Sequence, residues 1–152
     1  MAITFTSAPR KNFPDRKVLK SCLQETASSY NKKITELSYV FVSDDELLEM
    51  NVQFLQHDYF TDIITFDNSE EANVLEGDIF ISKDRVDENG KNLGSGVLEE
   101  YCRVVVHGLL HLCGLKDKSE PETNAMRKAE EVFISMYREK VLKPSLQSKG
   151  NL

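Results

Sequence analysis

Tryptophan is absent from this chain of 152 residues, and histidine, proline and glycine are scarce, with 3, 4 and 7 copies. So little proline and glycine, with no repeats, excludes a collagen-like or low-complexity chain. No stretch reaches the ~18 apolar residues of a membrane span. The first residues lack a basic segment followed by an apolar core, so no signal peptide is expected. These absences predict a cytoplasmic protein with no membrane partner.

Cysteine is sparse as well, with three residues and no pair in the CxxC spacing. In a cytosolic chain such residues are most simply free thiols that pack as small apolar side chains. Cys113 follows His107 by six positions and His111 by two, so on a helix it points away from their shared face. We therefore expect Cys113 in the core and not among metal ligands.

Positive charge is the minority, with 19 basic against 25 acidic residues and a net charge of −6, which argues against a protein that coats nucleic acid through overall charge. Seven of the 19 basic residues nevertheless fall within the first 33 positions: Arg10, Lys11, Arg16, Lys17, Lys20, Lys32 and Lys33. Two interpretations stay open, a solvated helix face or a local binding surface.

Alternation and β-branched or aromatic content predict strands at residues 2–7, 36–43, 62–66 and 77–82, the last two joined as a hairpin. Helical spacing of apolar residues predicts helices at 15–30, 44–55, 96–113 and 121–141. Ser43 and Glu46 fit a capping box at the second helix. This order predicts an α+β fold in which a small mixed sheet of about four strands packs with about five helices. We expect one domain over residues 1–142 and a polar tail over 143–152.

The segment HGLLHLCGLKD, residues 107–117, carries two of the three histidines at helical spacing. Residues four apart on a helix lie ~40° apart around the axis and ~6 Å apart along it, so His107 and His111 can reach one ion. Gly114 can end the helix, and Asp117 can then turn back as a third ligand. The alternative is a pair of core histidines bonded to carbonyl groups. The combined pattern favours one divalent metal ion at the end of a central helix. Zn²⁺ is the first choice, and nickel, cobalt and iron are also compatible.

Metalloproteases of the H-E-x-x-H type carry their general base directly after the first histidine. Here that position is Gly108, which can do no acid–base chemistry. A peptidase is therefore a minor possibility.

The segment resembles the signature H-G-x-L-H-L-x-G-Y-D-H of the YbeY family, the bacterial endoribonucleases of rRNA maturation. A second family block, L-N-x-x-Y-R-x-x-D-x-P-T-D-V-L-S-F, is similar to MNVQFLQHDYFTDIITF here, with matches at Asn51, Asp58, Thr61, Asp62 and Phe66. The resemblance spans roughly residues 35–137. It implies an α+β fold, a metal on two helical histidines and a third ligand, and cutting of single-stranded RNA. It also implies roles in small-subunit rRNA 3′-end maturation and ribosome quality control, with the ribosome and assembly factors as partners.

Two positions depart from the family pattern. Asp117 stands where the signature ends in histidine, and an anionic ligand lowers the net charge of the site. Leu55 stands at the family's arginine, so a bidentate donor for phosphate is missing. His57 could substitute as a phosphate donor or acid, or be an ordinary loop histidine. Asp62 could cap a turn, orient a ligand histidine or act as a base.

In the light of this resemblance the basic residues Arg10, Lys11, Arg16, Lys17 and Lys20 become RNA-binding candidates. The first hypothesis is a single-strand-specific, metal-dependent endoribonuclease. The second is a ribosome-assembly binding module whose metal is structural and whose nuclease activity is weak or lost. The third is a metal-dependent hydrolase of another substrate, including a peptidase.

Overall fold

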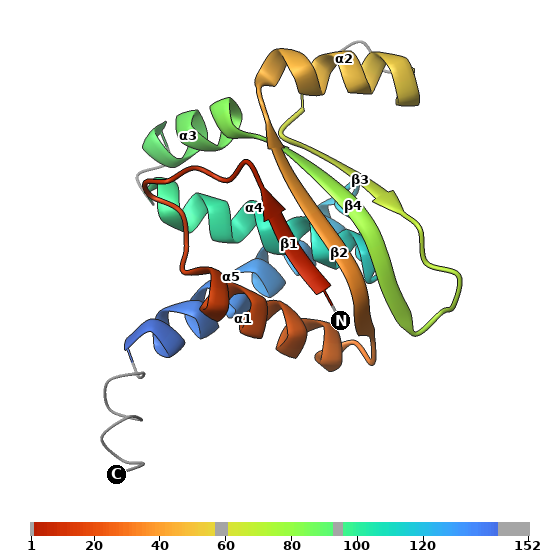
Figure 1. Cartoon of the computed structure of the whole chain (residues 1–152). Helices are drawn as coiled ribbons and strands as arrows, with labels where there is room; N and C mark the ends of the chain where they lie inside the picture. The colour runs from red at the N-terminus through yellow and green to blue at the C-terminus, as the bar shows by residue number, and fades with distance from the viewer. Residues whose placement is uncertain (1, 57–60, 93–95, 143–152) are drawn as a thin grey trace.

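The computed structural model describes residues 2–56, 61–92 and 96–142 (Figure 1). In chain order the elements are β1 (Ala2–Thr6), α1 (Arg16–Ser29), β2 (Lys33–Val42), α2 (Asp44–Leu55), β3 (Ile63–Asp67), β4 (Val74–Ser82), α3 (Lys83–Asn92), α4 (Val97–Leu112) and α5 (Glu120–Leu142). The predicted α+β class, with a four-stranded mixed sheet and five helices in the described ranges, is confirmed. The expected tail, 143–152, lies outside them.

The strands form one sheet in the order β1-β2-β4-β3. β2 pairs in parallel with β1 and with β4, and β3 runs antiparallel to β4, so the predicted hairpin is confirmed. β4 begins at Val74, three residues before the predicted start. β3 is an edge strand of this sheet, and the candidate site lies beside it.

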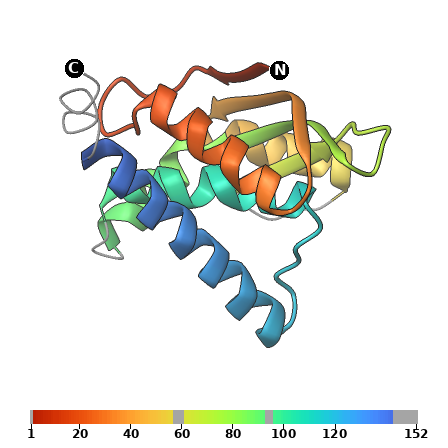
Figure 2. The same cartoon turned by 90° about the horizontal axis from the view of Figure 1, so that it is seen from below.

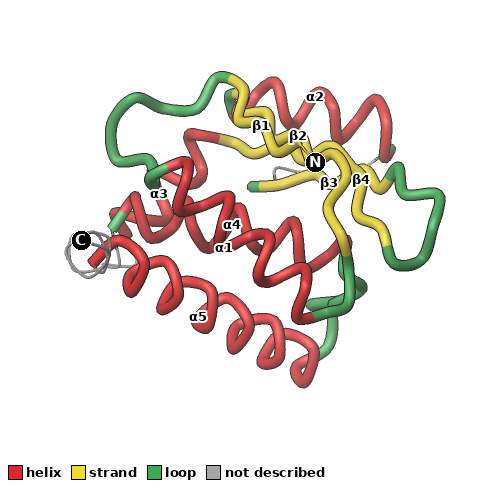
Figure 3. The backbone as a smooth tube through the Cα atoms, turned by 60° about the horizontal axis from the view of Figure 1, so that its bottom comes forward, coloured by secondary structure: helices red, strands yellow, loops and turns green. Residues whose placement is uncertain are grey.

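Helices cover both faces of the sheet. Ile79 pairs with Tyr39 of β2 and Thr65 of β3, and this face packs against α4. Phe66 lies on the opposite face, in edge-to-face contact with Phe54 of α2 at 6.3 Å between ring centroids. Figure 1 and Figure 3 accordingly show α1, α4 and α5 on one side of the strands and α2 on the other.

α4 is the central helix because apolar residues occupy most of its circumference, as expected for a helix enclosed by other elements. The hydroxyl of Tyr39 donates to the carbonyl of Val105 at 2.8 Å inside the core and ties this helix to the sheet. The last two turns of α4, which carry the histidines, are therefore held in place by the core.

The sequence patterns do not predict α3. Its sequence, KDRVDENGKN, offers Val86 as its one large apolar residue, so the helical periodicity is too weak to detect. One local contact and one tertiary contact support it. The backbone N–H of Arg85 donates to the Ser82 hydroxyl at 3.2 Å, and Gly90 lies so close to Val97 that an added Cβ would be 2.7 Å from the Val97 Cα.

None of the helices in the described ranges has the length and apolar run needed to cross a membrane. The three cysteines are free; Cys22 and Cys102 are buried, and Cys113 is partly exposed. The core placement expected for Cys22 and Cys102 is confirmed. Cys113, also expected in the core, is only partly buried and packs against the edge of the core, and it is not among the three side chains that could hold a metal.

Candidate metal centre and cleft

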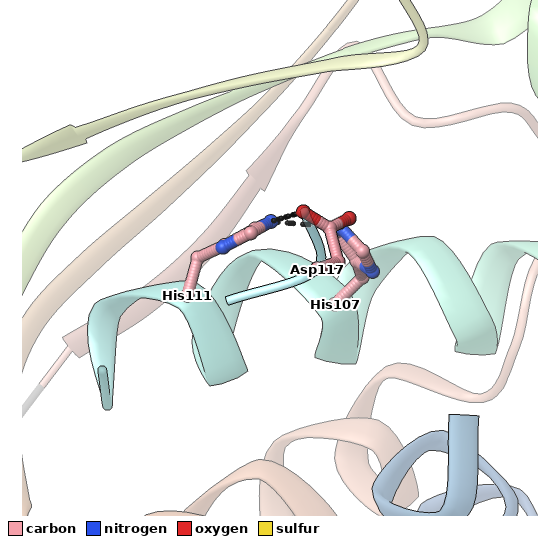
Figure 4. Close-up of side chains that lie close together, drawn as sticks. All are labelled: His107, His111 and Asp117. Carbon is pink, nitrogen blue, oxygen red and sulfur yellow. Dashed lines mark hydrogen bonds and ion pairs between the residues drawn. The ribbon is translucent and has the colours of Figure 1, made fainter. Parts of the chain in front are cut away.

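α4 places His107 and His111 on one face, and their Nε2 atoms lie 2.9 Å apart. Asp117 comes from the loop after the helix and faces both rings (Figure 4). Its Oδ2 is 3.3 Å from His107 Nε2, and its Oδ1 is 3.8 Å from His111 Nε2. The three side chains predicted from their spacing thus meet at one point.

Gly114 makes this meeting possible, with a φ of +104° directly after the helix. The N–H of Leu115 donates to the carbonyl of Leu110, and the N–H of Gly114 donates to that of His111, both at 3.0 Å. This is a Schellman motif, which glycine favours at the left-handed position. The chain then turns back toward the histidines, and the Thr123 hydroxyl donates to the Asp117 carbonyl at 3.0 Å, which holds the loop.

Both histidines have a partner at Nδ1. His111 Nδ1 lies 3.1 Å from the carbonyl oxygen of Leu115, and His107 Nδ1 lies 2.7 Å from Oε2 of Glu130. A carbonyl or carboxylate oxygen accepts a hydrogen bond from Nδ1–H, which leaves the lone pair of Nε2 free. The two nitrogens that converge are therefore the two that can bind an ion.

The pKa values of the two rings move in opposite directions. Burial lowers the pKa of His107, but the hydrogen bond and charge of Glu130, with the charges of Asp117 and Asp62, outweigh burial and raise it. Burial and the adjacent His107 lower the pKa of His111 more than Asp117 raises it. The two rings are therefore electrostatically unequal: acidic neighbours outweigh burial around His107, whereas burial and a neighbouring imidazole dominate around His111.

The donor set and spacing fit a divalent transition metal. Ligand atoms of a tetrahedral zinc ion, each about 2.0–2.2 Å from it, lie about 3.4 Å from one another. The separations of 2.9, 3.3 and 3.8 Å bracket that value. Two imidazoles and one carboxylate, with a fourth position open, form a set typical of catalytic zinc.

Glu130 is the residue of this site that the sequence patterns missed. It lies on α5, 23 residues after His107, and it is only 5% exposed. A signal was present, because Glu130 shares the buried face of α5 with Met126, Phe133 and Ile134. A carboxylate on such a face is rare unless it is paired.

A cleft of about 250 Å³ opens beside the metal ligands, between α2, β3 and the end of α4. His111 lines it together with Asn51, Leu55 and Thr61. Asp62 directly follows Thr61, and it belongs to the charges that raise the pKa of His107. The structure therefore brings Leu55 to the same cleft as His111 and places Asp62 within electrostatic reach of the cluster.

The basic candidates near the N-terminus do not line this cleft. Arg16 lies 5.9 Å from the ring centroid of Phe13, which contacts Tyr101 near the start of α4. His111 lies ten residues further along that helix, or about 15 Å. Figure 2 shows the start of α1 and the loop after α4 toward opposite ends of the molecule. His57 lies outside the described residues.

A family model described as endoribonuclease YbeY matches residues 6–138. The chain belongs to the YbeY family. An endoribonuclease YbeY of Cytophaga hutchinsonii is 50% identical over 121 residues, covering 80% of this chain and 85% of that protein. One of Bacteroides thetaiotaomicron is 42% identical over 138 residues, covering 90% and 99%. The solution structure of a Thermotoga maritima protein is 28% identical, covers 95% of each chain and has a TM-score of 0.64.

The glycine of the YbeY signature has a packing reason in this chain. A Cβ on Gly108 would lie 2.9 Å from Ile79 Cδ1 and 3.0 Å from Ile63 Cδ1. Position 108 therefore points into the sheet and not into the cleft. A glutamate at this position, as in the H-E-x-x-H proteases, would have no room.

Proposed function

We propose that this YbeY-family chain is a single-strand-specific endoribonuclease that depends on one divalent metal ion, with Zn²⁺ as the first choice. The observation that carries the proposal is the convergence of His107 Nε2, His111 Nε2 and the Asp117 carboxylate beside an open cleft. The family match supplies the substrate class, since the relatives bear the name endoribonuclease.

A divalent ion held by His107, His111 and Asp117 would supply Lewis acidity toward phosphate oxygens and water. The protein's own contribution is to fix the direction of both Nε2 lone pairs through the acceptors at Nδ1. Asp62 and His57 are the candidates for moving the proton of the attacking group, which is either water or the ribose 2′-OH.

The proposed biological role follows from the family resemblance. RNA would be the small-subunit rRNA near its 3′ end, and the setting would be late maturation and ribosome quality control. The ribosome or its small subunit, with assembly factors, would be the partner.

The RNA-binding candidates extend this proposal away from the cleft. Arg16 and Lys17 are exposed at the start of α1. If RNA contacts the start of α1, removing a basic residue there removes a phosphate contact and weakens the salt dependence of RNA binding. The slope of log K for RNA binding against log [salt] should then become less steep by about 0.7 for each lost contact. A double variant, Arg16→Ala with Lys17→Ala, tests this, with exposed Lys91→Ala on α3 as the matched control. An unchanged slope would assign the cluster to a solvated helix face.

A second candidate function is a ribosome-assembly module with a structural metal and little nuclease activity. Leu55 favours it, because this apolar side chain stands on the cleft wall where the family has arginine, and no Lys or Arg is among the described residues that line the cleft. A peptidase is less well supported, because Gly108 packs against the sheet.

The test pairs elemental analysis of the purified protein with cleavage of single-stranded rRNA by wild type, His111→Ala and Asp62→Asn. Glu120→Ala, an exposed acid near Asp117, serves as the matched control. We expect one metal ion per chain and cleavage that requires His111. Bound metal without His111-dependent cleavage would support the assembly module. No metal, even after reconstitution, would contradict both.

A further inference from the structure

Glu130 divides its two carboxylate oxygens between two partners on α4. Oε2 lies 2.7 Å from His107 Nδ1, and Oε1 lies 3.4 Å from Nη1 of Arg103. Arg103 precedes His107 by one helical turn, so both partners are on the same face of the helix. The shorter contact goes to the histidine. An ion pair alone would favour two parallel bonds to the guanidinium, so this division indicates a role toward His107.

Placing a carboxylate here is costly. Glu130 is 5% exposed, and removing a charge from water is strongly unfavourable unless partners compensate for the lost hydration. Arg103 supplies the compensation, and it also contacts Glu100 at 3.2 Å and Glu131 at 3.4 Å. An apolar residue at position 130 would fill the same space without this cost. Packing therefore does not account for the carboxylate, whereas orientation of His107 does.

We propose that Glu130 is a positioning residue for the metal centre: it accepts a hydrogen bond from His107 Nδ1–H and so directs the Nε2 lone pair at the ion, while Arg103 balances its charge. This inference rests on the proposed metal site and goes beyond its three ligands. Carboxylate partners of ligand histidines fix the tautomer and raise the basicity of the ring, and their loss typically weakens metal binding ~10–100-fold.

Glu130→Gln is the sharpest substitution. An amide has one acceptor oxygen, whereas Arg103 and His107 Nδ1–H both need one. If the oxygen faces Arg103, the NH₂ group faces Nδ1 and favours the tautomer with the proton on Nε2, which blocks the ligand atom. If the oxygen faces His107, the NH₂ group meets the guanidinium. Glu131→Gln is the matched control, because Glu131 also contacts Arg103 at 3.4 Å but its side chain is 61% exposed.

The experiment measures the affinity for ZnCl₂ alone by competition with a chromophoric chelator. We expect Glu130→Gln to bind ~10–100-fold more weakly than wild type, and Glu131→Gln to stay within about twofold. Equal affinity in Glu130→Gln and wild type would overturn the inference. So would an equal loss in both variants, because that would indicate a general charge effect around Arg103.

A second measurement uses the wild-type protein and does not depend on the fold of a variant. Ring ¹⁵N spectra of zinc-loaded protein should show His107 with its proton on Nδ1 and zinc on Nε2; zinc on Nδ1 would overturn the inference. RNA cleavage is measured separately. If zinc-loaded wild-type protein cuts no RNA, the proposed nuclease is overturned and the role of Glu130 stands. If Glu130→Gln binds zinc as tightly as wild type while the zinc-loaded wild type cuts RNA, the role of Glu130 is overturned and the proposed nuclease stands.

Discussion

Zinc should stabilise this protein, because its three candidate ligands come together only in the folded chain. Asp117 reaches the histidines because the Schellman turn reverses the chain after α4, and the unfolded chain has no such turn. Binding to the folded state alone stabilises by about 2.7 kcal/mol when free zinc is at 100 times Kd. For a domain of this size 1 kcal/mol shifts Tm by about 2–4 °C, so the expected rise is about 5–11 °C.

Differential scanning calorimetry of chelator-treated protein, with and without added zinc, measures this shift. His111→Ala removes one of three ligands and should reduce the rise to near zero. Glu120→Ala changes an exposed acid in the same part of the chain and should keep the full rise. If folded wild-type protein showed no rise, or if His111→Ala kept it, the assignment of the cluster as a metal site would be wrong.

Three further outcomes are expected. Leu55→Arg should increase kcat/KM for single-stranded RNA ~10-fold or more, since a charged hydrogen bond contributes about 1.5–3 kcal/mol; unchanged activity would mean that no phosphate clamp is missing at the cleft. Gly108→Glu should lower the free energy of unfolding in urea by about 3 kcal/mol or more, because it forces an unpaired carboxylate against the sheet; wild-type stability would contradict the packing at position 108. Burial raises the pKa of Cys22 to about 11 and of Cys102 to about 12, so iodoacetamide at about pH 8 should alkylate these thiols only after denaturation. Rapid alkylation of the native protein would contradict the burial of these thiols. Because both thiols are harder to ionise in the native state than in the unfolded chain, the free energy of unfolding should also fall as pH rises above the unfolded thiol pKa of about 8.5.

The sequence was sufficient where the interactions are local. The capping box of Ser43 and Glu46 and the end of α4 before Gly114 were both predicted and are confirmed. The four strands were found because alternation and β-branched content are strong in each. α3 was not predicted, since its apolar spacing is weak and its packing of Gly90 against Val97 is a tertiary contact; the cap from Ser82 is local, but the sequence patterns missed it.

The candidate metal ligands could be read from the sequence, because a helix fixes the geometry of His107 and His111 and glycine permits the turn that follows. Three features depend on how the chain packs: Asp117 closes on both rings, Leu55 shares a cleft with His111, and Glu130 from another helix holds His107. The difference lies in the range of the interactions. Helix geometry and turn preferences act over a few residues, whereas the packing of α5 on α4 joins side chains that have no fixed relation along the chain.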